Sequence, residues 1–317
     1  MIRYYAVSQN TCGEVFNIES SSWINLCPPF AAGELDDFAL KLGIESDFLT
    51  DPLDIEERAR YEKYDEARSI IFNTPVINES DKENDPIFIT VPMGIVLCQG
   101  KLITISSVEN PVLEKFFDNK VKNFNPKNET LFILQIFEQT VRLFLEYLKK
   151  LNMRRNLIEQ ELYHSSRSTE LQSLLRIEKS LVYFVNSLSA NELLKLKMKR
   201  TDFIAVKDNE ELSELFEDII VDNNQAREVA QLYTNILNGT MEAYASIISN
   251  NLNKFINRLT VITVILMVPT LVASFFGMNV PLPMNLENSW VSFYLVIVFS
   301  LGFSMMLIWF FKRKDVL

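Results

Sequence analysis

The sequence predicts an α+β domain that is followed by a long stalk helix and two transmembrane helices. Three observations support this fold class. Segments of β-prone and helical residues alternate over residues 1–127, a helical pattern continues from about Asp208 with no proline before Pro269, and two uncharged apolar runs lie near the C-terminus. A length of 317 residues accommodates about two domains. Because the apolar runs lie near the C-terminus, the large N-terminal part is expected to lie outside the membrane.

The first predicted domain, residues 1–127, combines a small sheet with helices. Segments rich in β-branched and aromatic residues predict strands at 2–8, 22–26, 68–76, 86–96 and 102–108. The tripeptide Gln99-Gly100-Lys101 predicts a hairpin turn between the last two strands. Residues 34–42 have apolar side chains at helical spacing, and Gly43 is placed to end that helix.

Two helical segments follow this domain. Residues 128–202 are predicted to form an antiparallel helical hairpin, because apolar residues recur every three or four positions after Leu131 and a break near His164-Ser165-Ser166 separates two helices. Residues 203–258 are predicted to form a stalk helix that continues into the first span. A helix of nearly 70 residues would be ~100 Å long. Its apolar positions require neighbours, which favours an oligomer.

The apolar runs at 259–276 and 290–311 contain no charged residue, and each is close to the ~20 residues that cross a bilayer. They are predicted to be the first and second transmembrane spans, joined by the loop 277–289. The alternative, a pair of buried core helices, is disfavoured by the length of both runs. Cations precede the first span and lie in the tail 312–317, but the loop has no Lys or Arg. This bias predicts a multi-pass protein of the cell (inner or plasma) membrane with both termini in the cytoplasm.

Composition argues against several function classes. The formal net charge of −10 argues against a nucleic-acid partner, which would need a basic surface to neutralise phosphates. No GxxxxGK[ST] loop is present, so no nucleotide is expected. The chain has one histidine, His164, and three widely spaced cysteines, which disfavours a catalytic zinc site. Because no nucleophile–base set stands out, we do not expect an enzyme, and we interpret the cysteines as reduced thiols.

A stripe of polar and apolar residues follows one face of the first span and of the helix just before it. Its members are three or four positions apart: Asn253, Ile256, Thr260, Thr263, Met267, Thr270 and Ser274. Such a face is typical either of helix–helix packing or of a wet pore, and the pattern alone leaves both interpretations open. A pore would need several subunits around an axis. Because the spans carry no charge, an ion would pass with most of its water, which Mg²⁺ loses most reluctantly.

One tripeptide connects these features to a known family. Gly277-Met278-Asn279 lies between two C-terminal spans and after a long helix, and it resembles the GMN signature of the CorA family of magnesium and other divalent-cation channels. Residues 253–260 (NKFINRLT) look like that family's entry to its first span. Residues 23–26, 51–53 and 58–65 are similar to its N-terminal patterns, so the resemblance covers nearly the whole chain.

The resemblance implies a homopentameric funnel, in which an αβα cytoplasmic domain leads through the stalk helix to a pore lined by the first span. Gly277, Met278 and Asn279 would form the outer mouth, with Asn279 as the main polar ligand to the ion's water and Gly277 permitting the turn out of the helix. The implied pore-lining and gating residues are Asn253, Ile256, Leu259, Thr260, Thr263, Met267, Thr270 and Ser274.

The resemblance also implies a regulatory role for acidic residues between subunits. Glu56 and Glu57 would face Asp218 on the stalk helix of the neighbour, and Glu242 would form an acidic ring near the axis. Mg²⁺ bound between these carboxylates would screen their repulsion and close the pore. The hypothesis is therefore an Mg²⁺ uptake channel in which Mg²⁺ is both the transported and the regulatory ion. Its partners would be further copies of the chain, divalent cations and the lipid bilayer.

The chain departs from the family pattern beyond the tripeptide. The loop that follows lacks the family's usual glutamate, for which Glu287 is a substitute, and Phe276 replaces a frequent tyrosine. The chain is also shorter than many relatives between Glu57 and Arg58. One alternative is a transporter of Zn²⁺, Co²⁺ or Ni²⁺ from the same superfamily, although the retained Met278 favours Mg²⁺. A second alternative is a membrane-anchored scaffold or sensor.

Overall fold

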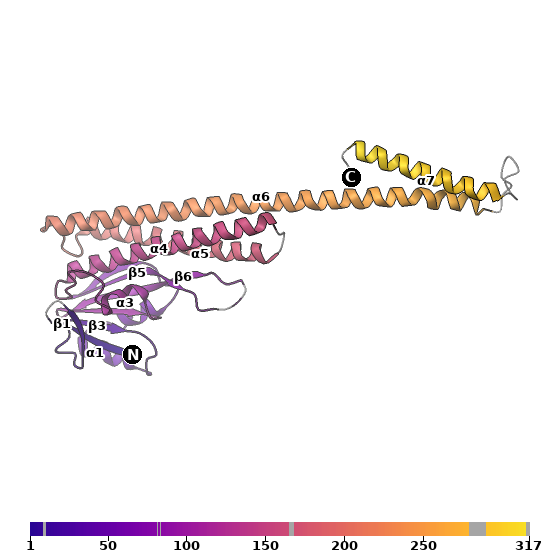
Figure 1. Ribbon diagram of the computed structural model, residues 1–317. Helices are drawn as coiled ribbons and strands as arrows, with labels where there is room; N and C mark the ends of the chain where they lie inside the picture. The colour runs from indigo at the N-terminus through magenta and orange to yellow at the C-terminus, as the bar shows by residue number, and fades with distance from the viewer. Residues whose placement is uncertain (9–10, 81, 83, 165–167, 279–289, 315–317) are drawn as a thin grey trace. The chain divides into compact units, whose positions relative to one another are not determined.

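The computed structural model describes residues 1–8, 11–80, 82, 84–164, 168–278 and 290–314. The chain divides into two compact units, Met1–Met241 and Glu242–Leu317, and each is described by itself (Figure 1). Several predictions fall outside the described residues. They concern Ser165 and Ser166 at the predicted helix break, Asn279 and Glu287 in the predicted external loop, and the end of the tail from residue 315.

The first unit contains a seven-stranded sheet. Its strands are β1 (Ile2–Ser8), β2 (Thr11–Val15), β3 (Trp23–Leu26), β4 (Arg60–Tyr64), β5 (Ala67–Ile77), β6 (Phe88–Cys98) and β7 (Lys101–Ser106), in the order β2-β1-β3-β7-β6-β5-β4. Among the strands that the structure describes, only β3 and β7 pair in parallel. Gln99 and Gly100 have positive φ angles of 50° and 68°. This is the conformation of a two-residue hairpin turn, and it confirms the predicted turn between β6 and β7.

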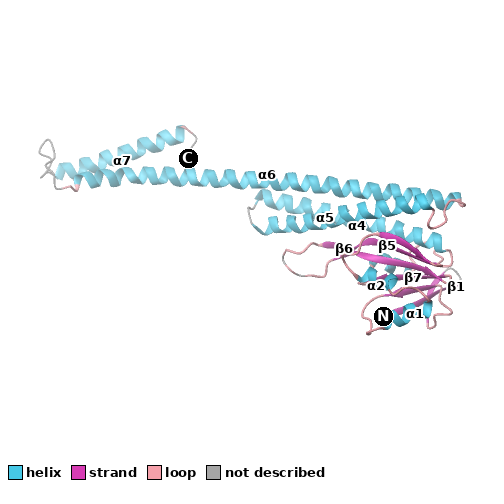
Figure 2. Ribbon diagram, turned by 180° about the vertical axis from the view of Figure 1, so that it is seen from behind, coloured by secondary structure: helices cyan, strands magenta, loops and turns pink. Residues whose placement is uncertain are grey.

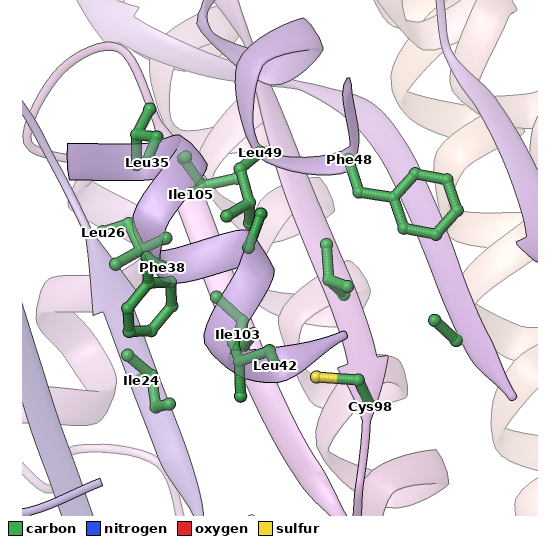
Figure 3. Packing of buried hydrophobic residues seen from close by; sticks show 13 residues of the cluster. Ile24, Leu26, Leu35, Phe38, Leu42, Phe48, Leu49, Cys98, Ile103 and Ile105 are labelled. Atoms are coloured by element: carbon green, nitrogen blue, oxygen red, sulfur yellow. The ribbon is translucent and has the colours of Figure 1, made fainter. Parts of the chain in front are cut away.

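Helices cover both faces of the sheet. On one face, α1 (Glu34–Leu42), α2 (Asp47–Thr50) and the 3₁₀-helix η1 (Asp51–Leu53) enclose an apolar cluster with β3 and β7. Figure 3 shows Ile24 and Leu26 of β3 beside Phe38 and Leu42 of α1. Gly43 ends α1 in the left-handed conformation, with φ 65°, as predicted.

The opposite face of the sheet packs on α3 (Pro111–Phe117) and α4 (Glu129–His164). Successive residues of a strand point to opposite faces. Trp23 therefore points away from the α1 cluster, and its ring lies 5.1 Å from the ring of Phe132 on α4 and 6.3 Å from that of Phe116 on α3. The layers are thus helix, sheet and helix, which is the predicted αβα arrangement.

The helix α5 (Ser168–Thr201) runs back beside α4 (Figures 1 and 2) and is bonded to the sheet by polar side chains. The side chain of Asn191 accepts a hydrogen bond from the Asn73 N–H at 2.9 Å and donates one to the Asn73 carbonyl at 2.8 Å. The Ser180 hydroxyl accepts the N–H groups of Ile87 and Phe88 at 2.9 and 3.0 Å. These bonds fix α5 to strands β5 and β6.

A single helix, α6 (Glu210–Phe276), belongs to both units, and α7 (Trp290–Arg313) lies alongside its C-terminal part (Figures 1 and 2). Residues 203–209, which we assigned to the stalk, precede α6 and are not helical. Both helices contain a stretch that is long and apolar enough to cross a membrane, and only 6% and 11% of these stretches are buried. A core helix of a soluble protein would be mostly buried, so the core-helix alternative does not fit.

Candidate functional site

The second unit packs α6 and α7 through one narrow face of each helix. On α7, the least exposed positions include Ser300 and Ser304, which are 7% and 8% exposed. On α6, Val261 is 3% exposed, and Val264, Val268 and Val272 are partly buried. These positions recur every three or four residues, so they form one face. Small residues allow two helices to approach closely in a bilayer.

The predicted stripe lies on the other side of α6. Residues of an α-helix are rotated by about 100° from one to the next, which places the stripe roughly opposite Val261 and Val268. All its members are exposed in the single chain, and so is the implied pore residue Leu259; the members are Asn253, Ile256, Thr260, Thr263, Met267, Thr270 and Ser274. Met267 is 65% exposed and Ile256 48%. The stripe is therefore not used for packing against α7.

The threonines of the stripe share one hydrogen-bonding arrangement. The hydroxyls of Thr260, Thr263 and Thr270 donate to the carbonyl oxygens four residues earlier, at 2.9, 2.8 and 3.0 Å. A hydroxyl has one donor and two acceptor lone pairs. Because the backbone takes the donor, each threonine presents acceptor capacity outward. Water molecules bound to a cation point their hydrogens away from it, so they can donate to these hydroxyl oxygens.

Gly277 and Met278 continue the end of α6. The Gly277 N–H donates to the Ala273 carbonyl at 3.0 Å, and the Met278 N–H donates to the Phe275 carbonyl at 3.4 Å. The left-handed glycines of the described chain are Gly33, Gly43 and Gly100. Gly277 is not among them: α6 ends at Phe276, and Gly277 lies in the turn that follows. The bond from Gly277 still spans four residues, whereas the bond from Met278 spans three, as in the last turn of a helix that is ending.

The predicted regulatory acids differ in their surroundings. Glu57 is partly buried and forms an ion pair with Arg60. Arg60 also pairs with Asp51 at 2.5 Å and with Glu62 at 2.8 Å. Burial raises the pKa of Asp51, and the hydrogen bond from Arg60 opposes this rise. Asp51 and Glu62 were missed as members of this cluster. Only the tertiary fold brings Arg60 to Asp51 on η1, whereas Glu62 lies two residues after Arg60 on β4, where alternation puts both side chains on one face.

Glu56, Asp218 and Glu242 are all exposed. In the described part of one chain, no group of three or more His, Cys, Asp or Glu side chains is placed to hold a metal ion. Glu56 and Asp218 belong to no such group, so the predicted site that they share would form between chains. Cys27 and Cys98 are free thiols, and burial raises the pKa of Cys98 to about 11.

A close contact in the sheet positions the segment that carries Asp51, Glu56 and Glu57. Pro52 of η1 is buried against β6 at Gly94. A Cβ atom at Gly94 would lie 2.4 Å from Pro52 Cγ and 2.8 Å from Ile105 Cγ2. Only glycine leaves room for η1 at this place, so Gly94 determines how closely the acidic segment approaches the sheet.

Comparison with known proteins agrees with this architecture. The family model described as CorA-like Mg²⁺ transporter protein matches residues 19–313. The chain is 27% identical over 290 residues to the cobalt/magnesium transport protein CorA of Methanocaldococcus jannaschii, which covers 89% of this chain and 88% of that protein.

Two solved structures share the fold. The complete structure of the CorA magnesium transporter from Methanocaldococcus jannaschii matches with a TM-score of 0.80 at 24% identity, over 99% of this chain and 98% of that chain. The ZntB cytoplasmic domain from Vibrio parahaemolyticus matches with a TM-score of 0.58 at 12% identity, over 79% of this chain and 97% of that one. Because the family model covers most of the sequence, the chain belongs to the family of CorA-like Mg²⁺ transporter proteins.

Proposed function

We propose that the chain is one subunit of a homopentameric channel that takes up Mg²⁺ through the cell membrane. The observation that carries this proposal is the exposed stripe on α6, opposite the face that packs on α7. Five copies with their stripes toward a common axis would enclose a path, and α7 would lie on the lipid side of α6. Both termini would be cytoplasmic, as the distribution of cations predicts.

The chemistry of the stripe suits a hydrated divalent cation. Rings formed by Thr263 and Thr270 would offer hydroxyl oxygens to the ion's water, because their donors are already used by the backbone. Rings of Met267 and Ile256 would form apolar constrictions, which gate by dewetting. Asn279 would contact the ion's water at the outer mouth. A divalent ion gains about 4.6 kcal/mol per 100 mV when it moves inward, so no nucleotide is needed.

Cytoplasmic Mg²⁺ would close the channel by binding between subunits. Glu56 and Asp218 are exposed, and so is Glu242; carboxylates brought together by neighbouring chains would repel each other until a cation neutralises them. Glu57 is less available, because it is paired with Arg60. The regulatory contribution of the N-terminal domain is therefore assigned mainly to Glu56.

The test of the pore is the variant Asn279→Ala, expressed in a strain that depends on external Mg²⁺. We expect loss of Mg²⁺ uptake with an unchanged oligomer, because the variant removes the amide that meets the hydrated ion. Asn285→Ala is the matched control, since it removes the same side chain from the same predicted loop, and it should transport normally. Normal growth of Asn279→Ala at low Mg²⁺ would contradict the proposed pathway.

The ion is tested separately, because the fold is shared with a ZntB domain. Flux into liposomes should be compared for Mg²⁺, Co²⁺, Ni²⁺ and Zn²⁺, with and without a pH gradient. We expect Mg²⁺ flux that follows the membrane potential and is independent of the pH gradient. Zn²⁺ flux that requires the gradient would favour the alternative of a zinc transporter. Absence of flux for all four ions would favour a scaffold or sensor.

A further inference from the structure

A buried lysine lies where α5 meets α6. The Lys195 side chain of α5 is 1% exposed, and its Nζ donates a hydrogen bond to Asn223 Oδ1 of α6 at 2.7 Å. The same nitrogen lies 5.3 Å from the centre of the Phe137 ring of α4. Lys195 thus lies between three helices, and neither the proposed ion path nor the predicted regulatory acids make use of it.

The partner of Lys195 is held in place from the other side. Asn223 is 0% exposed, and its Nδ2 donates to the Leu188 carbonyl of α5 at 2.9 Å. Asn223 therefore bonds α5 twice, once through its amide nitrogen and once through its amide oxygen. This is a specific contact between α6 and the helix that is fixed to the sheet.

The charges around Lys195 do not neutralise it. The carboxylate of Glu192, one turn earlier on α5, raises the pKa of Lys195 because its negative charge favours the protonated amine. However, Glu192 is itself paired with Arg227 of α6 at 2.8 Å, and α4 contributes the ring of Phe137. Burial is the larger effect, and it lowers the pKa of Lys195 to about 7. Its proton is therefore held weakly at neutral pH.

We propose that Lys195 makes the contact between α5 and α6 sensitive to protonation: the neutral amine favours the packed arrangement, and the protonated amine favours separation of α6 from α5. The direction follows from linkage. Lys195 in water has an ordinary pKa near 10.4, so the separated arrangement binds the proton more tightly than the packed one, and acid shifts the equilibrium toward separation. Between pH 8 and pH 6 the separated population is expected to increase about tenfold, with little further change below pH 6.

The consequence for transport rests on the proposed function. Because α6 continues into the first span, a weaker α5–α6 contact would release the stalk helix from the domain that carries Glu56. Cytoplasmic acidification would then change the concentration of Mg²⁺ that closes the channel. The contact itself can be tested without any transport measurement.

The experiment is hydrogen exchange by mass spectrometry on the full-length protein in detergent, at pH 6 and pH 8, corrected for intrinsic exchange rates. In the wild type, exchange in peptides that cover residues 188–195 and 219–227 is expected to be about tenfold faster at pH 6. Lys195→Met keeps the length of the side chain without the amine, and it should remove this difference. Lys197→Met is the matched control on the same helix, because Lys197 is exposed, and it should behave as the wild type.

A second variant keeps the proposal testable if Lys195→Met does not fold. Asn223→Asp places a carboxylate beside Lys195, which keeps the amine protonated over this range and should also remove the difference between pH 6 and pH 8. A wild type without that difference, or a Lys195→Met variant that retains it, would overturn the proposal. Inhibition of flux by Mg²⁺, measured at cytoplasmic pH 6 and pH 8, then tests the link to transport. If inhibition does not depend on pH, that link is wrong, but the hydrogen-exchange result for the α5–α6 contact is unaffected.

Discussion

At the scale of single residues, two adjacent acids have different roles. Glu56 and Glu57 are equivalent in the sequence, and both were predicted to bind the regulatory ion. The fold separates them, because Glu57 is paired with Arg60 whereas Glu56 is exposed. Ion binding by Glu57 would have to compete with the guanidinium of Arg60, which Asp51 and Glu62 also contact.

This difference predicts that two conservative variants affect different properties, one the stability of the fold and the other the inhibition by Mg²⁺. Glu57→Gln removes the charge that pairs with Arg60, so we expect a loss of about 1 kcal/mol in the free energy of unfolding and little change in inhibition by Mg²⁺. Glu56→Gln should leave stability unchanged and raise the Mg²⁺ concentration needed for half-inhibition of flux. Denaturant unfolding and liposome flux measure the two effects. If Glu57→Gln rather than Glu56→Gln shifts the inhibition, the assignment is reversed.

At the scale of elements, the packing of η1 on β6 depends on one glycine. Gly94→Ala would place a Cβ 2.4 Å from Pro52 Cγ, which is too short for any pair of carbon atoms. We expect a loss of about 1–3 kcal/mol in the free energy of unfolding, as is usual for overpacking. We also expect altered inhibition by Mg²⁺, because the segment that carries Glu56 has to move.

The control for this prediction is Gly13→Ala in the edge strand β2, where an added Cβ has no neighbour within 4 Å. It should change stability by less than about 0.5 kcal/mol. Denaturant unfolding of both variants decides the question. Equal stability of the two variants would mean that η1 is not held against the sheet as described.

The elements also show what the sequence could and could not predict. The helix 34–42 with Gly43 and the hairpin at Gln99 follow from local patterns, and the structure has them at those positions. The strands β2 and β4 were missed, because an edge strand such as RYEKY lacks the apolar alternation of a buried one.

The same distinction applies to the candidate site. The stripe on α6 could be predicted, because helical periodicity places its members on one face. The ion pair of Arg60 with Asp51 and the contact of Lys195 with Asn223 could not, because they join residues that only the tertiary fold brings together. The fold also shows that Gly277 follows α6 without a left-handed conformation, which the sequence alone does not show.

At the scale of the whole molecule, one chain leaves its apolar helices largely uncovered. Only 6% and 11% of the two candidate spans are buried, and Met267 and Leu266 are 65% and 63% exposed. Lipid can cover the apolar residues, but it cannot satisfy the acceptors of the threonine hydroxyls, since hydrocarbon offers no hydrogen bonds. A stripe that holds both kinds of residue is therefore expected to face other copies of α6 and water.

This arrangement predicts which positions can be cross-linked between subunits. In a chain whose three cysteines are replaced by alanine, Thr263→Cys on the stripe should form covalent dimers with a short bis-maleimide reagent in native membranes. Val298→Cys is the control, because Val298 lies on α7 and is 66% exposed, on the side that would face lipid. A symmetric ring places the same stripe residue of each subunit near its neighbours, whereas outward residues of α7 are far apart. Cross-linking at Val298 but not at Thr263, read on a denaturing gel, would mean that α6 does not surround the axis.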